Sequence, residues 1–471
     1  MNKFGICTLV LSITLVACGG GGNSVAGIDA GGGPVKVGVV AKGTIAGFGS
    51  IVVNGVRYET TTASIDNDGV VGMQSDLKVG QVVIVKGSLD SNGTTGSADS
   101  VSFGDLVEGP ISAVNTVAGT ITVLGQLVFI DADTSFDDSI SPPSIDGLAV
   151  NDTVEVSGFV RADGSISATR IEDKPVGTEF EVTGEVSNLT ASTFQINSLV
   201  VDFSAAQLDD FPTGSPQLGQ LVEAKGQTLG GSGELLATRV EFKGSDLGAD
   251  AGDRVEIEGF ITRFASATDF DVEGVPVTTS GSTAFVNGTA ADLGINRKLE
   301  VEGTIGATGV ISATKVELKL ANFIRIEGMV EAKGTASLTI FGIPIGINSQ
   351  TRLEDKSSAD VRSFSLANIS VGDYLETRGY EDASGVVATL VEREDFNGDV
   401  AIRAFVDTVS NPTFTIRGVM IETNGGTTFR DLNNQVISAA AFFGQAMGRL
   451  VEADGASSNG GILADEVALE D

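Results

Sequence analysis

The chain has 471 residues, with 62 acidic and 29 basic side chains, a net charge of −33 and no histidine. This charge repels phosphate backbones and anionic lipid surfaces, so we expect no nucleic acid partner. The lack of histidine excludes Ser-His-Asp and Cys-His catalysis and histidine-containing metal sites. An apolar content of 41% is sufficient for packed cores.

Residues 1–17 have the features of a lipoprotein signal peptide. Lys3 precedes an apolar run that is too short to be a permanent membrane span. The segment Leu15-Val16-Ala17-Cys18 resembles the bacterial lipobox, and that resemblance implies cleavage before Cys18 and attachment of diacylglycerol to its sulfur. The alternative is an ordinary signal peptide followed by a chance cysteine.

The residues after the predicted cleavage point indicate a tethered envelope protein. Several acyl chains on Cys18 give lasting membrane attachment without a transmembrane helix. Gly19 occupies the place where an Asp commonly marks retention at the inner membrane, so we expect the outer membrane, with the protein facing the periplasm or the cell surface. Residues 18–38 form the lipidated cysteine and a glycine-rich, flexible tether.

One sequence stretch recurs six times in the rest of the chain. It is clearest as Leu299–Gly303 followed by Val310–Glu317. Its shared glycine falls at Gly87, Gly158, Gly226, Gly303, Gly379 and Gly455. This spacing predicts six repeats of about 65 to 77 residues, at 39–104, 105–174, 175–244, 252–320, 321–396 and 397–471.

Each repeat shows the pattern of three strands, a variable connection and two further strands. The first hairpin is clearest at Ser50–Tyr58, where Asn54-Gly55 separates two alternating runs. Its second strand leads to a Thr-x-Phe-like end, such as Thr134-Ser135-Phe136. In the sixth repeat the connection, residues 434–447, is apolar enough for a short helix.

This strand order predicts an all-β protein: a tandem array of about six small OB-like, five-stranded β-barrels after the signal and tether. A small sandwich and an open meander remain alternatives. The repeated glycines do not stand at the start of helices, so they do not form phosphate-binding loops. We expect them to allow a β-bulge or a close approach of two backbones.

The order Gly-x-Val, hairpin, Val-x-x-Gly and Ile-Ala-x-x-Val-Glu resembles the tandem repeats of a bacterial domain of unknown function, family 5666, which is common in proteobacterial lipoproteins. The resemblance covers Val39 to the C-terminus and implies no activity, cofactor or catalytic residue. The sixth repeat departs most, with Ala404 in place of a glycine and an altered Ala464–Val467, and we expect it to cap the array.

Two segments look like fragments of a calcium-binding loop, Asp66–Gly69 and Asp395–Asp399. The twelfth position, where such a loop has a bidentate Glu, holds Leu77 or Val406 instead. Asp, Asn and Gly are also common in turns, so we expect no metal site and no cofactor.

Acid pairs such as Asp137/Asp138 and Asp209/Asp210 are expected by chance in so acidic a chain. No such pair recurs among the repeats and nothing indicates a raised pKa, so we expect no catalytic residues. An OB-type ligand face on the second strand, Phe270–Glu273, offers acids and aliphatics. An acidic face of this kind does not suit nucleic acid. The lack of Trp weakens the case for saccharide binding.

The sequence therefore favours a non-enzymatic outer-membrane lipoprotein with a structural or interaction role, as a spacer or adhesion-type module. We expect its working surface on the variable connections between the third and fourth strands. A polysaccharide-binding envelope module is the alternative, and a carbohydrate-active hydrolase is a remote one. The expected partners are the membrane, through the lipid, and an envelope protein or polysaccharide.

Overall fold

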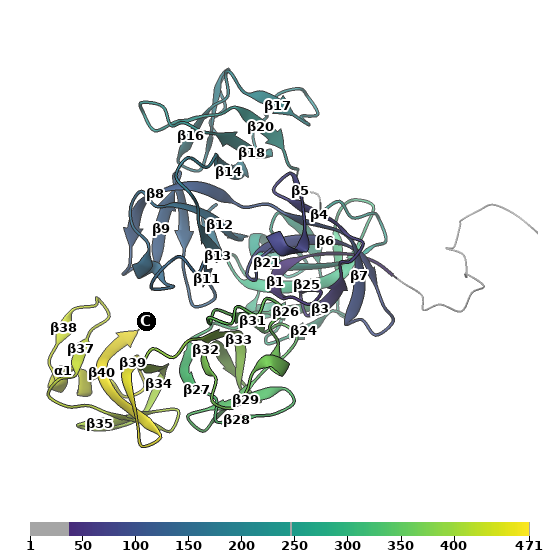
Figure 1. Ribbon diagram of the computed structural model, residues 1–471. Helices are drawn as coiled ribbons and strands as arrows, with labels where there is room; N and C mark the ends of the chain where they lie inside the picture. The colour runs from purple at the N-terminus through teal and green to yellow at the C-terminus, as the bar shows by residue number, and fades with distance from the viewer. Residues whose placement is uncertain (1–36, 245–246, 471) are drawn as a thin grey trace, which may run out of the picture. The chain divides into compact units, whose positions relative to one another are not determined.

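A computed structural model describes residues 37–244 and 247–470 (Figure 1). The predicted signal peptide, with Leu15, Val16, Ala17 and Cys18, lies outside the described residues, as does nearly all of the tether. Among the residues that are described, no helix is both long enough and apolar enough to cross a bilayer.

Five strand positions recur in each repeat. In repeat 1 they are β1 (Val37–Gly47), β2 (Ile51–Val53), β3 (Val56–Glu59), β6 (Val82–Leu89) and β7 (Thr95–Phe103). In repeat 2 they are β8 (Val107–Asn115), β9 (Thr120–Val123), β10 (Gln126–Phe129), β12 (Thr153–Val160) and β13 (Ile166–Asp173). In repeat 3 they are β14 (Phe180–Glu185), β15 (Thr193–Ile196), β16 (Leu199–Asp202) and β18 (Leu221–Gly226), with the fifth position divided between β19 (Leu235–Leu236) and β20 (Arg239–Phe242).

The second half of the chain repeats the pattern. Repeat 4 contains β21 (Arg254–Ser266), β22 (Asp269–Val272), β23 (Val275–Thr278), β25 (Lys298–Ile305) and β26 (Ile311–Leu318). In repeat 5 the first position is divided between β27 (Ile324–Met329) and β28 (Ala332–Lys333), followed by β29 (Ser337–Ile340), β30 (Ile343–Gly346), β32 (Tyr374–Asp382) and β33 (Gly385–Glu394). Repeat 6 contains β34 (Val400–Ser410), β35 (Thr413–Ile416), β36 (Val419–Glu422), β39 (Leu450–Ser458) and β40 (Gly461–Glu470).

The strand pairing closes these elements into barrels in every repeat except repeat 3, where β15, β16 and β19 form a separate sheet. In repeat 1, β1 pairs with β2, β2 with β3, β3 in parallel with β7, β7 with β6, and β6 with β1. The third and fifth strands are parallel in all six repeats. This order, 1-2-3-5-4-1, is that of an OB barrel, so the predicted fold class is confirmed. The predicted Asn54-Gly55 turn has φ values of 50° and 78°, which match a type I′ hairpin.

The connections between the third and fourth strands contain short elements of their own. They are β4 (Ser64–Asn67), β5 (Val70–Gly72) and η1 (Gln74–Asp76) in repeat 1; β11 (Ser135–Phe136) and η2 (Ile145–Gly147) in repeat 2; and β17 (Gln207–Asp209) in repeat 3. They continue with β24 (Ala284–Val286) and η3 (Ala290–Asp292) in repeat 4; β31 (Arg352–Asp355) and η4 (Leu366–Asn368) in repeat 5; and β37 (Thr428–Arg430), β38 (Val436–Ile437) and α1 (Ala439–Phe443) in repeat 6. Helix α1 confirms the short helix predicted there, and its Phe442 is fully buried against Phe414 and Phe429.

A short sixth strand in each repeat was not expected from the sequence. It begins at or near the Thr-x-Phe-like end and pairs in parallel with the fifth strand. In four repeats the Thr hydroxyl holds it in place by donating to an Ala carbonyl on the fifth strand, over 2.7–2.9 Å. These pairs are Thr134–Ala168, Thr283–Ala313, Thr351–Ala388 and Thr427–Ala464.

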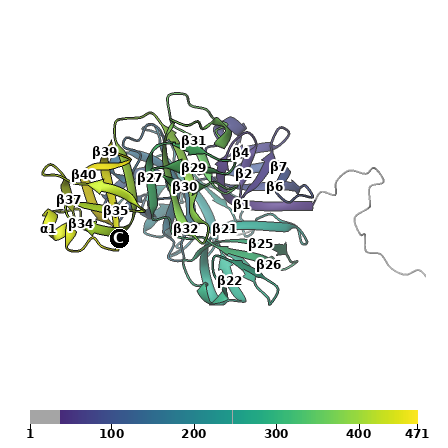
Figure 2. The same ribbon diagram turned by 90° about the horizontal axis from the view of Figure 1, so that it is seen from below.

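The barrels associate in pairs through their first strands. Strand β1 of repeat 1 pairs in parallel with β21 of repeat 4, from Val39↔Arg254 to Lys42↔Ile257 (Figures 1 and 2). Strands β8 and β14 join repeats 2 and 3, and β27 and β34 join repeats 5 and 6, both in antiparallel fashion. Repeats 2 and 3 also share one apolar core, as do repeats 5 and 6.

Candidate functional site: glutamate rows between the repeats

Glutamates stand directly opposite one another across the first, fourth and fifth strands of three repeats. These glutamate rows are Glu108–Glu155–Glu172 in repeat 2, Glu258–Glu300–Glu317 in repeat 4 and Glu327–Glu376–Glu392 in repeat 5. In repeat 3, Thr183 takes the first place beside Glu223 and Glu241. Like charges directly opposite on a sheet are destabilising unless they are compensated, so the rows need an explanation.

The interpretation that no acid pair recurs among the repeats was therefore wrong. The paired glutamates are far apart in sequence, and the register of β-strands brings them together. The sequence did contain a usable signal. One glutamate stands three residues before the shared glycine, as Glu300 does before Gly303, and its partner ends the recurring stretch, as Glu317 does.

Lysines compensate the row of repeat 4. Lys319 Nζ lies 2.8 Å from Glu300, Lys298 Nζ lies 3.3 Å from Glu258, and Lys315 Nζ lies 2.8 Å from Glu317. Burial raises the pKa of Glu300 above its ordinary value, although Lys319 counteracts this shift. The pKa of Lys319 is raised in turn, because the attraction of Glu300, Glu258 and Glu317 outweighs the effect of burial. The row is therefore an ion-pair network.

Arginines compensate the row of repeat 5. Arg325 bonds to Glu327 and also lies 3.3 Å from Glu376, while Arg378 bonds to Glu376 and lies 3.7 Å from Glu392. Burial by itself would raise the pKa of Glu376, but Arg378 and Arg325 hold it below its ordinary value. Glu376 therefore stays ionised as the centre of this network.

The rows face other repeats. Thr44 of repeat 1 donates its hydroxyl to Glu258 over 3.3 Å, and Gln350 of repeat 5 donates its amide to Glu300 over 3.0 Å. Both contacts border a small cavity of about 90 Å³. Arg325 of repeat 5 also reaches Glu452 of repeat 6 at 2.5 Å. The rows thus supply polar contacts between barrels.

Several variable connections contact other repeats as well. Arg352 in β31 of repeat 5 is buried and donates to Ser135 Oγ and to the Thr169 carbonyl of repeat 2, over 3.4 and 3.3 Å. Arg362, further along the same connection, donates to the Leu77 carbonyl of repeat 1 over 2.9 Å and lies 4.2 Å from the centre of the Phe48 ring. We expected the variable connections to form the working surface. Parts of the connection of repeat 5 instead contact repeats 1 and 2, so those parts are not free to bind a partner.

The six shared glycines lie where the fourth strand closely approaches the fifth. The ladder has a β-bulge at Gly87, Gly158, Gly303, Gly379 and Gly455. An added Cβ at any of these five or at Gly226 would lie only 2.0–2.5 Å from a backbone carbonyl oxygen across the ladder. None of the six has a positive φ, so the requirement is for space and not for a left-handed conformation.

One calcium-loop fragment spans the end of β4 and the turn after it, and the other lies between β33 and β34. Asp395 accepts a backbone hydrogen bond from Ser358 over 3.0 Å, and Asn397 accepts one from Asp399 over 3.0 Å. Asp66 is exposed on β4. Asp68 follows β4 with a φ of 55°, and Lys225 of repeat 3 contacts its side chain at 2.9 Å.

Comparisons with known proteins complete this description. No curated protein matches the chain. A solved structure titled "drosophila Unr CSD456" is 15% identical, with 43% of this chain and 96% of that chain covered and a TM-score of 0.15. The family model described as "Domain of unknown function (DUF5666)" matches six times, at residues 37–101, 108–172, 183–241, 258–317, 327–392 and 403–468. These six matches confirm the resemblance noted in the sequence, and the chain belongs to the DUF5666 family as a protein of six tandem repeats.

Proposed function

We propose that this protein is a non-enzymatic, lipid-anchored envelope protein with a structural or interaction role. The observation that supports this proposal most directly is the way in which the barrels are joined. First strands pair between repeats 1 and 4, 2 and 3, and 5 and 6, and the glutamate rows lie between repeats. The recurring charged groups thus hold one repeat against another, as expected for a scaffold that presents a fixed surface.

A hydrolase would use its carboxyl groups differently. Glycoside hydrolysis requires two carboxyl groups across a cleft that admits the sugar, about 5–9.5 Å apart. The glutamates of the rows are paired with Lys and Arg where the repeats meet, for example Glu300 with Lys319 and Glu376 with Arg378. This arrangement favours the structural role over catalysis.

The proposed anchor is Cys18, in the lipobox-like segment that begins at Leu15. The proposed location is the outer membrane, because Gly19 replaces the Asp that commonly marks inner-membrane retention. The proposed contact surface comprises the connections of repeats 3 and 6, which expose Leu218, Leu432 and Met447, and the proposed partner is an envelope protein.

Fractionation of cells that express the full chain tests the anchor. The wild type should incorporate a radiolabelled fatty acid and sediment with the outer membrane, whereas Cys18→Ser should do neither. Cys7→Ser, within the predicted signal, is the matched control and should behave as the wild type. Membrane retention of Cys18→Ser without label would overturn the proposed anchor.

The Cys18→Ser chain, released from the membrane, then tests whether the protein cleaves or binds polysaccharides. We expect no release of reducing ends from a panel of bacterial envelope polysaccharides and no retention on them. Release would show that the protein is a hydrolase. Retention that weakens as repeats are deleted would instead show that it is a polysaccharide-binding module. Either result would overturn the proposed protein-contact role.

A further inference from the structure

The glutamate row of repeat 2 continues into a larger group of acids where repeats 1, 2 and 3 meet. This acidic junction consists of Asp68, Asp105, Glu108, Glu155, Glu181 and Glu223. Asp68 comes from the turn between β4 and β5, and Asp105 from the short segment between β7 and β8, at the start of repeat 2. Glu108 and Glu155 belong to repeat 2, while Glu181 and Glu223 belong to repeat 3.

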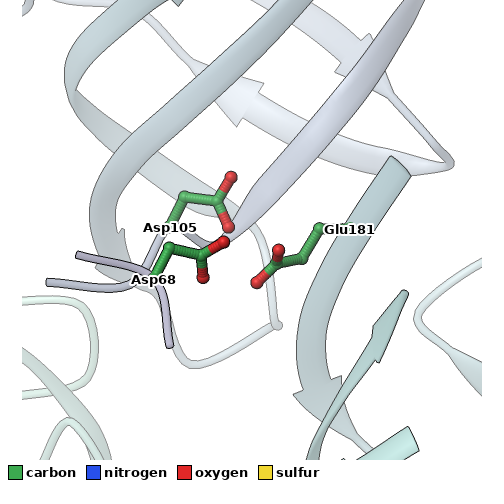
Figure 3. Close-up of side chains that lie close together, drawn as sticks. All are labelled: Asp68, Asp105 and Glu181. Carbon is green, nitrogen blue, oxygen red and sulfur yellow. The ribbon is translucent and has the colours of Figure 1, made fainter. Parts of the chain in front are cut away.

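Three of these carboxylates converge on one point. An oxygen from each of Asp68, Asp105 and Glu181 lies within 4.8 Å of the other two, and Figure 3 shows the three side chains pointing toward one another. Asp105, Glu108 and Glu155 form a second triad within the same limit. Asp105 is therefore common to both triads.

The lysines at the acidic junction are too few to neutralise it. Lys225 Nζ lies 2.6 Å from Glu181 and 2.9 Å from Asp68, and Lys174 bonds to Glu155 and lies 4.0 Å from Glu108. Lys243 Nζ lies 3.0 Å from Glu223. With every group ionised, six carboxylates stand against three lysines. The row of repeat 4, by contrast, has three lysines for its three glutamates.

Several carboxylate oxygens of the acidic junction are buried without a hydrogen-bond donor. Asp105 and Glu181 are each only 4% exposed, and Asp105 Oδ1 and Glu181 Oε1 have no hydrogen-bond partner among residues 37–244 and 247–470. Lys225 contacts the other oxygen of Glu181, Oε2. Glu108 Oε1 is likewise buried and without a donor. A charged oxygen that is buried without a partner is strongly unfavourable, so such groups in proteins are paired, bind a metal ion or lose their charge.

The pKa values show the same imbalance. Burial raises the pKa of Asp105 well above its ordinary value, and Glu155, Asp68 and Glu108 raise it further. Burial also raises the pKa of Glu108 to about 7, although Lys174 opposes this shift. The direction of both shifts agrees with the excess of carboxylates over lysines in the geometry.

We propose that a divalent cation, with Ca²⁺ the best match in chemistry, binds between Asp68, Asp105 and Glu181. Ca²⁺ takes oxygen ligands at about 2.3–2.6 Å, so two oxygens on one ion are at most about 5 Å apart, which the converging carboxylates satisfy. It also tolerates irregular geometry, whereas Mg²⁺ demands a near-ideal octahedron. The ion joins the turn after β4 in repeat 1, the start of repeat 2 and strand β14 of repeat 3.

This site departs from the expectation that the protein has no metal site. Asp68 belongs to the Asp66–Gly69 fragment, but the other two ligands lie far along the chain, so the spacing rule for a calcium loop does not apply. The site is independent of the proposed envelope function, because an ion at this position holds repeats together wherever the protein resides.

Calorimetric titration of the full chain with CaCl₂ at pH 7, after removal of metals with EDTA, tests the proposal. The wild type should bind one ion saturably, and bound Ca²⁺ should raise its Tm because only the folded state assembles the ligands. Asp105→Asn and Glu181→Gln should each weaken binding by about tenfold or more, because each removes a charged ligand. Asp210→Asn, an exposed position in repeat 3, is the matched control and should bind Ca²⁺ as the wild type does.

Two outcomes would overturn the site. One is a wild-type protein that shows neither saturable heat nor a rise in Tm up to 10 mM CaCl₂ (about a thousandfold above the Kd of the weakest sensor sites). If Asp105→Asn is then more stable than the wild type, a proton shared by Asp105 and Glu181 neutralises the acidic junction instead. The other is unchanged Ca²⁺ affinity in both Asp105→Asn and Glu181→Gln, which would place the bound ion elsewhere.

Discussion

At Gly303 an added Cβ atom would lie 2.5 Å from the Ser312 carbonyl oxygen, across the bulge between β25 and β26. Contacts under 3.0 Å force one of the two backbones to move. The glycine is needed for this close approach, which explains why it recurs at the same place in each repeat.

We therefore expect Gly303→Ala to lower the free energy of unfolding by about 1–3 kcal/mol, the usual range for overpacking. Gly306→Ala, in the same hairpin, is the matched control, because its nearest neighbour across the turn lies at 3.6 Å. Urea unfolding and limited proteolysis of repeat 4 measure both variants. Equal stability of the two would show that close approach is not the reason for Gly303.

The raised pKa of Glu108 predicts that the free energy of unfolding depends on pH. Its pKa is raised from 4.5 to about 7 in the folded protein, chiefly by burial, while Lys174 and Lys225 oppose and Glu155 and Asp68 reinforce the shift. Between those pH values the folded state binds more protons than the unfolded state, so the free energy of unfolding must fall as pH rises from about 4.5 to 7.

Glu108→Gln should therefore reduce this loss of stability between pH 5 and pH 8, measured by urea midpoints with EDTA present. Glu185→Gln, an exposed position in repeat 3, should leave the pH dependence as in the wild type. An unchanged pH dependence in Glu108→Gln would contradict the raised pKa.

At the scale of the element, the short sixth strand connects two sequence motifs, the Thr-x-Phe-like end and the shared glycine of the fourth strand. The Thr of the Thr-x-Phe-like end donates to the Ala that stands opposite the bulged glycine, as Thr351 does to Ala388 opposite Gly379. The sequence showed both motifs but not their relation, because the hydrogen bond joins residues on different strands.

Thr351→Val keeps the shape of the side chain and removes the hydroxyl, which leaves the buried Ala388 carbonyl without this donor. We expect a loss of about 1–3 kcal/mol in the free energy of unfolding. Thr339→Val, on the half-exposed face of β29, should change it by less than about 0.5 kcal/mol. Urea unfolding of the full chain distinguishes the two, and a similar effect of both would argue against the bond.

At the scale of the whole molecule, the repeats do not associate in simple sequence order. Repeat 1 pairs with repeat 4 through β1 and β21, and Lys225 of repeat 3 reaches back to Asp68 of repeat 1 at 2.9 Å. Linear solenoids have contacts only between neighbours, so this protein departs from that simple case.

A zero-length carbodiimide cross-link tests this association in solution. Lys225 and Asp68 should become joined within one chain, and mass spectrometry of the digest should detect the link. Lys315 with Glu302, a contact of 3.1 Å within repeat 4, serves as the positive control. Detection of the control link alone would favour a chain in which only successive repeats touch.

Local patterns in the sequence determined the all-β class, the six repeats, the OB strand order, the Asn54-Gly55 turn and the helix in the last connection. Alternation, turn residues and spacing act over a few residues, so they can be read directly. Only the tertiary structure decided which barrels pair, which connections are covered, and that Asp68 meets Glu181. Those contacts depend on strand register and on the match between distant surfaces, and neither leaves a local pattern in the chain.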